Sequence, residues 1–519
     1  MDLDLLIHGG TVVDGTGAPA YRADVGVKGG RIVALGDLAE AAAASRIDAT
    51  DRAVSPGFID AHIHSETALR GNKDQLGSSY QGVTTHLTSP DGFGWAPLPP
   101  IDAQQLWRGT SFAEGNPGFR PAWHTVEEYL AGFEGSVPVN VVPVAPHQAI
   151  RFAVLGWDPK EPDAAELERM RDVLRQWLDA GAVGLNTGLD YPPAAHSTTR
   201  ELIELAKVVA QHGGVYASHM RYQGLGRPDA LREAAEIGRS AGVPVNVSHE
   251  TIDDDTEPIH AEARADVDFA FDWYVYPAGS STLLVNMPPE DQVGGIDGVM
   301  ARLRDPATRA RFARLAEEYL VAAYASGARE YFSDTTSGDH IGRSIREIAE
   351  QRGRPLGETA IDLLEEEAPD VLLVFKRGMS DEQFEALARR TITQPGYTVA
   401  SDGIYHGVLP HPRGYGTFTR FLRLWVREKG VLSLEDAIRR MTGGVADRYG
   451  IKDRGRVAEG LAADLVVFDP ATVSDHATWE QPRERPTGVD AVLVNGRVVI
   501  QGGRPTGELP GRVVRRGDR

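Results

Sequence analysis

The chain has 519 residues, more than one ordinary domain needs, and this length suits a large barrel with insertions plus a smaller partner domain. Its formal net charge of −20 is spread along the chain, which argues against nucleic acid or an anionic membrane surface as a partner. Cysteine is absent, so disulfides and thiolate chemistry are excluded and any metal must be held by nitrogen and oxygen ligands.

The chain does not start with a basic segment followed by an apolar one, as a signal peptide would. No apolar run approaches the roughly 20 residues that cross a bilayer. We therefore expect a cytoplasmic protein that acts on a small-molecule substrate, without a nucleic-acid or membrane partner. Composition leaves its oligomeric state open.

Both ends of the chain have the pattern of short strands separated by turns. Alternating or continuous β-branched residues occur in 5–15 and 32–35, and again in 464–468 and 491–499, where Asn495-Gly496 is a hairpin turn. The first group favours a small antiparallel sheet. Together they predict one small β-sandwich domain formed from residues 1–55 and 455–519.

The middle of the chain, residues 56–454, alternates short apolar strands with helical stretches such as 163–180 and 200–212, which is typical of a parallel α/β fold. Eight predicted strands indicate a TIM (β/α)8 barrel; they lie near 54–60, 82–88, 139–145, 182–186, 214–218, 243–248, 268–274 and 397–401. Between the last two, residues 277–395 form a predicted insertion with helical patterns near 297–327 and 341–368, a candidate lid.

Polar residues follow four of the predicted strands at the end where barrel enzymes place their chemistry. Alternation along the first strand puts His62 and His64 on one face. His219 ends the fifth strand, His249 the sixth, and Asp402 follows the eighth. Each has an ordinary explanation when taken alone: a His-x-His pair on the surface, a buried core histidine, or an Asp-Gly turn. Together they predict a ring of metal ligands at the barrel mouth.

Imidazoles and a carboxylate suit Zn²⁺ or a similar divalent ion, one or two per subunit. Such an ion lowers the pKa of bound water to about 7, which supplies hydroxide for attack on a carbonyl. Asp402 is then the predicted catalytic residue, because it can bind this water, take its proton and pass it to a leaving nitrogen.

These residues lie in segments that resemble the N-acyl-D-amino-acid deacylases (D-aminoacylases) of the amidohydrolase superfamily over nearly the whole chain. The matching segments are 7–15 (IHGGTVVDG), 56–64 (PGFIDAHIH), 184–193 (GLNTGLDYPP), 218–221 (SHMR), 401–403 (SDG), 411–418 (HPRGYGTF) and 460–469 (GLAADLVVFD). The resemblance implies His62 and His64 at one metal position, His219 and His249 at the other, and Asp402 as general acid and base.

Tyr191 and Arg413 fall where members of the family contact substrate, and a guanidinium suits a carboxylate. Two positions depart from the family pattern. Asp91 stands in place of a metal-binding cysteine, which implies a harder metal ligand, with His86 as a reserve candidate. Thr251 stands where the family often has a lysine that helps to hold the substrate carboxylate.

The resemblance and the residues together predict a metal-dependent hydrolase that deacylates an N-acyl-D-amino acid or a related amide with metal-bound hydroxide. Two alternatives stay open at this point. The same machinery could act on a cyclic amide or imide, on a lactone, or as a deaminase. A non-catalytic barrel is the alternative from another class of protein.

Overall fold

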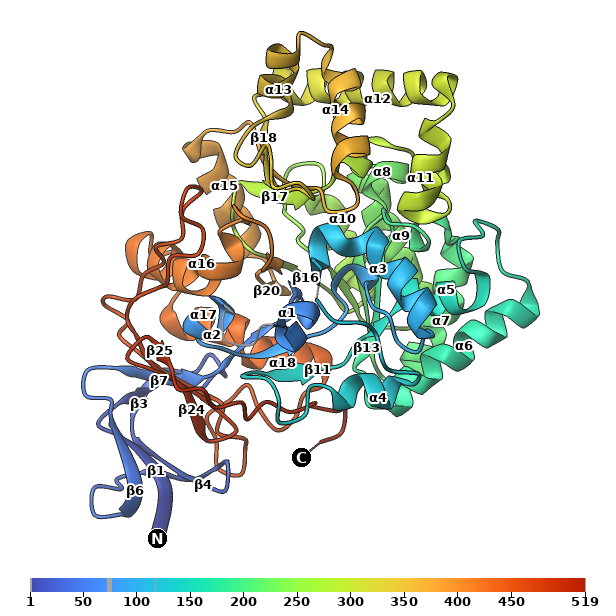
Figure 1. The fold of residues 1–519 in the computed structure, drawn as a ribbon. Helices are drawn as coiled ribbons and strands as arrows, with labels where there is room; N and C mark the ends of the chain where they lie inside the picture. Colours follow the sequence, from blue (N-terminus) through green and yellow to red (C-terminus); the bar gives the residue numbers. More distant parts are fainter. Residues whose placement is uncertain (1, 72–76, 117, 519) are drawn as a thin grey trace.

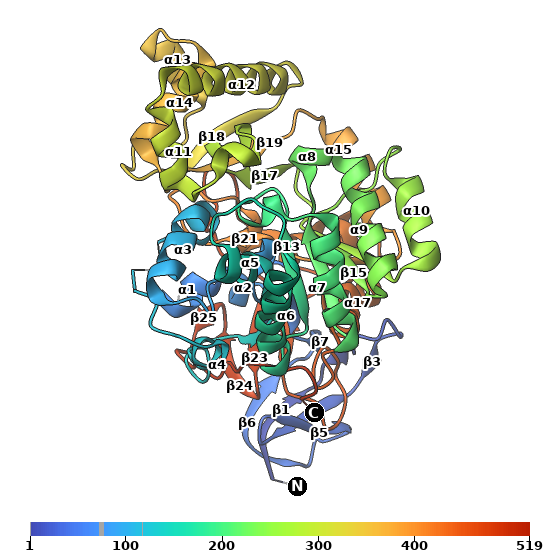
Figure 2. The same ribbon diagram turned by 90° about the vertical axis from the view of Figure 1, so that its right-hand side faces the viewer.

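The computed structural model describes residues 2–71, 77–116 and 118–518. Residues 1 and 519, the outer ends of the two predicted terminal segments, lie outside this range. Figures 1 and 2 show three parts along the molecule: strands from both chain ends at one end, parallel strands surrounded by helices in the middle, and the inserted segment at the opposite end. In the described part of the chain, no helix is long and apolar enough to cross a membrane.

Two sheets are built from the chain ends, and a shared hydrophobic cluster that includes Leu5, Val25 and Leu465 packs them together. The four-stranded sheet has the order β5 (Arg31–Gly36), β4 (Asp24–Lys28), β1 (Asp2–His8), β6 (Ala42–Asp48). The seven-stranded sheet has the order β25 (Arg504–Pro505), β24 (Arg497–Gln501), β23 (Val489–Val494), β22 (Leu465–Phe468), β7 (Ala53–Pro56), β2 (Thr11–Val12), β3 (Tyr21–Arg22).

The N-terminal strands, expected to form an antiparallel sheet, pair in both directions. β1 pairs with β4 in the antiparallel direction but with β6 in parallel, and β2 is parallel to β7. The chain divides its N-terminal strands between the two sheets, because β7 pairs with β22 of the C-terminal segment and β2 and β3 extend that sheet beyond β7. The predicted turn at Asn495-Gly496 joins β23 to β24, with Asn495 at φ 48° and Gly496 at φ 75°.

Each of the eight predicted central strands coincides with a strand of the structure, and the neighbouring strands are parallel. One sheet has the order β11 (Asn140–Val142), β10 (Val83–Leu87), β8 (Phe58–Asp60). The other has the order β12 (Ala145–Pro146), β13 (Gly184–Gly188), β14 (Val215–His219), β15 (Val245–Val247), β16 (Phe269–Trp273), β20 (Tyr397–Val399).

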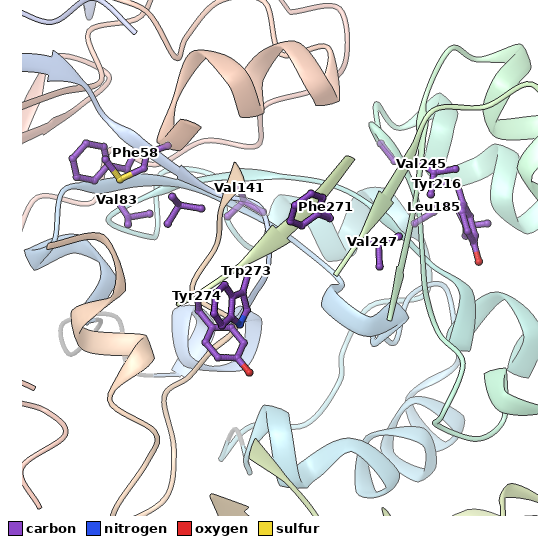
Figure 3. Close-up of a cluster of buried hydrophobic side chains, with 14 of the residues drawn as sticks. Phe58, Val83, Val141, Leu185, Tyr216, Val245, Val247, Phe271, Trp273 and Tyr274 are labelled. Atoms are coloured by element: carbon purple, nitrogen blue, oxygen red, sulfur yellow. The ribbon is translucent and has the colours of Figure 1, made fainter. Parts of the chain in front are cut away.

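Helices follow the parallel strands and cover them from outside (Figure 1). They begin where the sequence supplies a cap: Asp163 and Glu166 form a reciprocal capping box at the start of α6 (Ala164–Asp179). Figure 3 shows apolar side chains of neighbouring strands, such as Leu185, Val245 and Phe271, in one buried cluster. The other main helices are α3 (Pro100–Glu114), α5 (His147–Leu155), α7 (Thr199–Gln211), α9 (Arg227–Ala241), α10 (Glu257–Asp266), α15 (Asp381–Ile392), α16 (Arg413–Arg420), α17 (Leu434–Met441) and α18 (Gly443–Tyr449).

The segment between β16 and β20 contains its own hydrophobic cluster, which includes Phe312, Leu320 and Leu373. Its helices, α11 (Gly295–Leu303), α12 (Pro306–Ala325), α13 (Ile345–Arg352) and α14 (Leu356–Glu367), fall in the predicted helical regions. It also contains an antiparallel sheet that the sequence did not predict, with the order β17 (Ala278–Ser281), β19 (Leu372–Lys376), β18 (Arg329–Asp334).

Candidate metal centre

His62 and His64 reach the same point from the segment that follows β8. The Nδ1 atom of His64 lies 2.9 Å from Oε1 of Glu114 at the end of α3, which turns its Nε2 atom toward the centre. The backbone is held as well, because Asp60 accepts hydrogen bonds from the amides of His62 (3.3 Å) and Ser401 (3.0 Å). The imidazole of His64 and the backbone of His62 are therefore held in place by buried carboxylates.

His219 and His249 come from two neighbouring strands, β14 and β15. His219 ends β14, His249 follows β15, and Nδ1 of the first lies 2.9 Å from Nε2 of the second. Asp190 lies 3.1 Å from Nε2 of His219, while Asp272 accepts a hydrogen bond of 3.0 Å from the amide of His249. A carboxylate thus supports each of these residues.

Asp91 lies among all four imidazoles. Its carboxylate oxygens are 3.3 Å from Nε2 of His62, 3.6 Å from Nε2 of His64, 3.6 Å from Nδ1 of His219 and 3.8 Å from Nε2 of His249. The residue that departs from the family pattern therefore occupies the middle of the cluster.

Asp402 completes the group. Its Oδ1 atom lies 3.6 Å from Nε2 of His62 and 3.4 Å from Nε2 of His64, and its Oδ2 atom lies 2.8 Å from Arg413. The donor atoms form three sets whose members all lie within 4.8 Å of one another: His62, His64, Asp91; His62, His249, Asp402; and Asp91, His219, His249.

The charge states of His62, Asp91 and Asp402 suit metal binding, whereas the carboxylates beside His64 and His249 outweigh burial and raise the pKa of those two imidazoles. Burial lowers the pKa of His62 to about 4 although Asp91 and Asp402 oppose this, so its imidazole is neutral at pH 7. Burial would raise the pKa of Asp402, but Arg413 and the imidazoles outweigh it and hold that pKa below its usual range. The histidines do the same to the pKa of Asp91. Both carboxylates are therefore ionised.

Two buried atoms at this centre, Nε2 of His62 and Oδ1 of Asp91, have no hydrogen-bond partner within the described residues. Buried polar atoms normally have one, and an orphaned pair 3.3 Å apart fits a shared cation. The nitrogen and oxygen donors present are those that Zn²⁺ takes in proteins. His86 is not part of this group, because its ring nitrogens contact Ser65 (2.9 Å) and Ser78 (3.1 Å) instead.

A cavity of about 480 Å³ opens over the centre. Tyr191 and Arg413, the two predicted substrate contacts, both line it. The ring of Tyr191 packs 4.8 Å from that of His219, and Arg413 lies over the ring of Tyr274 at 4.4 Å while its Nη1 atom contacts Asp402. Thr251 also lines the cavity.

Sequence reasoning missed several residues of this site. Glu114 and Asp272 lie in no recognisable sequence motif. Their contacts with His64 and His249 become visible only in the folded structure. Asp190 stands inside the matching segment 184–193, which was the one signal available for it. Arg377 reaches the cavity from the end of β19 in the insert, far from every motif in the chain.

The turn that carries Asp91 touches β13 at Gly188, where a Cβ atom would lie 2.1 Å from the carbonyl oxygen of Asp91. We expect Gly188→Ala to lower the free energy of unfolding by about 1–3 kcal/mol, measured by urea denaturation, because the turn must move. Gly109→Ala is the control, since its Cβ would be 3.6 Å from Trp157 within α3. Equal effects of the two substitutions would contradict the close contact.

The family model described as "Amidohydrolase family" matches residues 46–500. The D-aminoacylase of Alcaligenes xylosoxydans xylosoxydans is 36% identical, with 99% of this chain and 98% of that protein aligned. A solved D-aminoacylase structure, from work on its binuclear metal centre, has a TM-score of 0.81 at 34% identity and covers 99% of this chain and 100% of its own. The N-acyl-D-glutamate deacylase of Bordetella bronchiseptica, solved with zinc and a phosphonate inhibitor, gives 0.83 at 32% identity with the same coverage.

These matches span the strands and the site described above. The chain belongs to the amidohydrolase family.

Proposed function

We propose that this protein is a metal-dependent hydrolase that cleaves the amide bond of N-acyl-D-amino acids. The observation that carries the proposal is the convergence of four imidazoles on two ionised carboxylates beneath a cavity large enough for a small molecule. The similarity to D-aminoacylase and to an N-acyl-D-glutamate deacylase supports the choice of bond and of stereochemistry.

The side chains that would hold the metal are those of the cluster: His62, His64, Asp91, His219, His249 and Asp402. We propose Zn²⁺, since the donors are nitrogen and oxygen and the related deacylase was solved with zinc. The central carboxylate of Asp91 touches both histidine pairs, which supports room for one or two ions. When bound, such an ion lowers the pKa of a coordinated water to about 7 and polarises a carbonyl oxygen.

The protein's own residues supply the proton transfers and the orientation. Asp402 is ionised and faces the cavity, so it can accept a proton from the attacking water and return it to the leaving nitrogen. Arg413 holds this carboxylate in place and lines the same wall, where it can also contact substrate. Burial raises the pKa of Tyr191 well above its usual value, so its phenol stays protonated and can donate a hydrogen bond to the substrate.

We also propose that the two parallel sheets form one closed (β/α)8 barrel over 56–454. Two contacts between the segments that follow β8 and β20 support this closure. β9 (Ile63–His64) pairs with β21 (Gly403–Ile404), and the amide of Asp402 donates a 2.8 Å hydrogen bond to the carbonyl of His62. The terminal segments 1–55 and 455–519 form a separate sandwich domain. The insert 277–395 acts as a lid, since its residues Tyr319 and Arg377 border the cavity.

Arg377 is our candidate for the substrate carboxylate. It stands at the exposed rim of the cavity and has no ion pair among the described residues. A guanidinium can bind both oxygens of a carboxylate at once. The amide to be cleaved lies next to the carboxylate in an N-acyl amino acid, so this contact would orient it toward the metal centre.

The test is hydrolysis of N-acetyl-D-methionine by the zinc-loaded protein, with the L-enantiomer and N-acetyl-D-methioninamide as controls. We expect turnover of the D-acid, at least about 100-fold slower turnover of both controls, and a KM raised about 10- to 100-fold in Arg377→Ala with kcat little changed. Equal turnover of the acid and its amide would contradict the carboxylate contact. Hydrolysis of a cyclic imide or a lactone in place of all N-acyl amino acids would contradict the proposed function.

A further inference from the structure

We infer that Trp479, in the C-terminal segment, is a positioning residue for Arg377, because it holds the base of the insert from which Arg377 reaches the cavity. The inference rests on the proposed function, in which Arg377 binds the substrate carboxylate. Among the described residues, Trp479 is not part of the cavity lining. It must therefore act through the residues that it contacts.

The base of the insert is the place where the chain enters it before β17 and leaves it after β19. There the amide of Arg377 donates a 2.8 Å hydrogen bond to the carbonyl of Pro277. The next pair along the two antiparallel strands is Ala278 and Lys376. The backbone of Arg377 is thus fixed only as well as this base is held.

Trp479 contacts both chains of the base. The Nζ atom of Lys376 lies over its ring, 4.6 Å from the centroid, a favourable place for a cation. The ring of Tyr276 meets it at nearly a right angle, with the centroids 6.2 Å apart. Tyr276 directly precedes Pro277, and Lys376 directly precedes Arg377. One partly buried tryptophan therefore spans the entering and the leaving chain.

The segment that carries Trp479 is anchored outside the insert on both sides. Before the tryptophan, Asp475 pairs with Arg423 at 2.7 Å. After it, Arg483 donates a 2.9 Å hydrogen bond to the carbonyl of Val408. The ring therefore has a fixed support against which the base of the insert can rest.

A further contact of Trp479 has supports of its own. The ring of His411 lies 5.0 Å from that of Trp479, but it also packs against Tyr274 at 5.9 Å. His411 is 0% exposed, and its Nδ1 atom accepts a 3.0 Å hydrogen bond from the amide of Arg413. Arg413 in turn contacts Asp402 at 2.8 Å. Loss of Trp479 is thus expected to loosen the base of the insert while Asp402 keeps its place.

The experiment measures hydrolysis of N-acetyl-D-methionine by zinc-loaded Trp479→Ala. We expect KM to rise about 5- to 30-fold with kcat within about threefold of wild type, because the carboxylate contact is displaced and the proton transfers are not. Trp479→Phe keeps an aromatic face and should restore KM to within about twofold of wild type.

Trp157→Ala is the matched control. Trp157 is also partly buried and also faces the insert, since a Cβ atom at Gly295 would lie 2.7 Å from its ring. Gly295 starts α11, so this contact is with a helix of the insert and not with its base. We expect the wild-type KM in this variant.

Combination with Arg377→Ala separates positioning from a general loosening. In that background Trp479→Ala should change KM by less than about twofold, because the contact that it positions is already gone. The same increase in KM in both backgrounds would overturn the inference and leave the proposed function intact. An unchanged KM in folded Trp479→Ala would do so as well. If Trp479→Ala does not fold, Trp479→Leu keeps apolar bulk without the ring and takes its place.

Hydrogen exchange tests the base of the insert without turnover. Amides of β17 and β19 should exchange at least about 10-fold faster in Trp479→Ala than in the wild type and in Trp157→Ala. Unchanged exchange would overturn the inference. Faster exchange in a protein that hydrolyses no N-acyl-D-amino acid would overturn the proposed function, while Trp479 would keep its role at the base of the insert.

Discussion

Asp402→Asn should lower kcat for N-acetyl-D-methionine by about 10²- to 10⁴-fold, the usual contribution of a positioned general acid and base. Asparagine keeps the shape of the side chain and tolerates the left-handed backbone at this position, where φ is 48°. The loss is therefore expected to reflect the missing proton acceptor, and KM should change far less than kcat.

The control for this substitution is Asp475→Asn. Asp475 is also buried and paired with an arginine, since it contacts Arg423 at 2.7 Å, but it does not line the cavity. We expect this variant to retain nearly wild-type kcat. Metal content and the unfolding temperature are measured on both proteins. An Asp402→Asn protein that keeps metal and more than a tenth of the wild-type kcat would exclude the assigned proton transfer.

The second large effect is a loss of bound metal, which we expect for Asp91→Asn. Asp91 places an ionised carboxylate among four imidazoles, and an amide would leave those nitrogens with a neutral, weaker ligand. Bound zinc, measured by elemental analysis after dialysis, should fall by at least about one equivalent per chain, and hydrolysis should fall with it. The backbone φ of 53° is again one that asparagine adopts readily.

His86→Gln serves as the control for metal content. His86 is buried close to the site, but its nitrogens contact serine hydroxyls. Its zinc content should equal that of the wild type. Chelation supplies a further readout, because removal of zinc should lower the unfolding temperature of the wild type more than that of Asp91→Asn. Unchanged zinc in Asp91→Asn would assign the metal to the histidines alone.

The parallel strands in the middle of the chain could be predicted from the sequence because each is a short apolar run bounded by turns. The polar residues of the site follow these runs directly. His219 and Asp402 come at strand ends, so the order of strands was enough to bring them together. Asp91 could be assigned only by resemblance, because a Pro-Asp-Gly segment is an ordinary turn when taken alone.

Other features depend on contacts between distant segments, which no local pattern records. The division of the N-terminal strands between two sheets follows from the pairing of β7 with the C-terminal strand β22. The small sheet of the insert was not predicted because the helical periodicity of the surrounding sequence is stronger than the strand pattern of its three short segments. Arg377 reaches the cavity only because that sheet carries it there. The ion pairs of Arg413 with Asp402 and of Arg227 with Glu250 likewise could be identified only from the positions of the side chains.

The separate hydrophobic cluster of the insert has a consequence for how this protein can change over evolution. The side chains of the proposed chemistry all stand on the central parallel strands and the turns after them, whereas Tyr319 and Arg377 belong to a segment with its own interior. Mutations that reshape the insert can therefore alter which molecules are selected while the groups that break the bond keep their places.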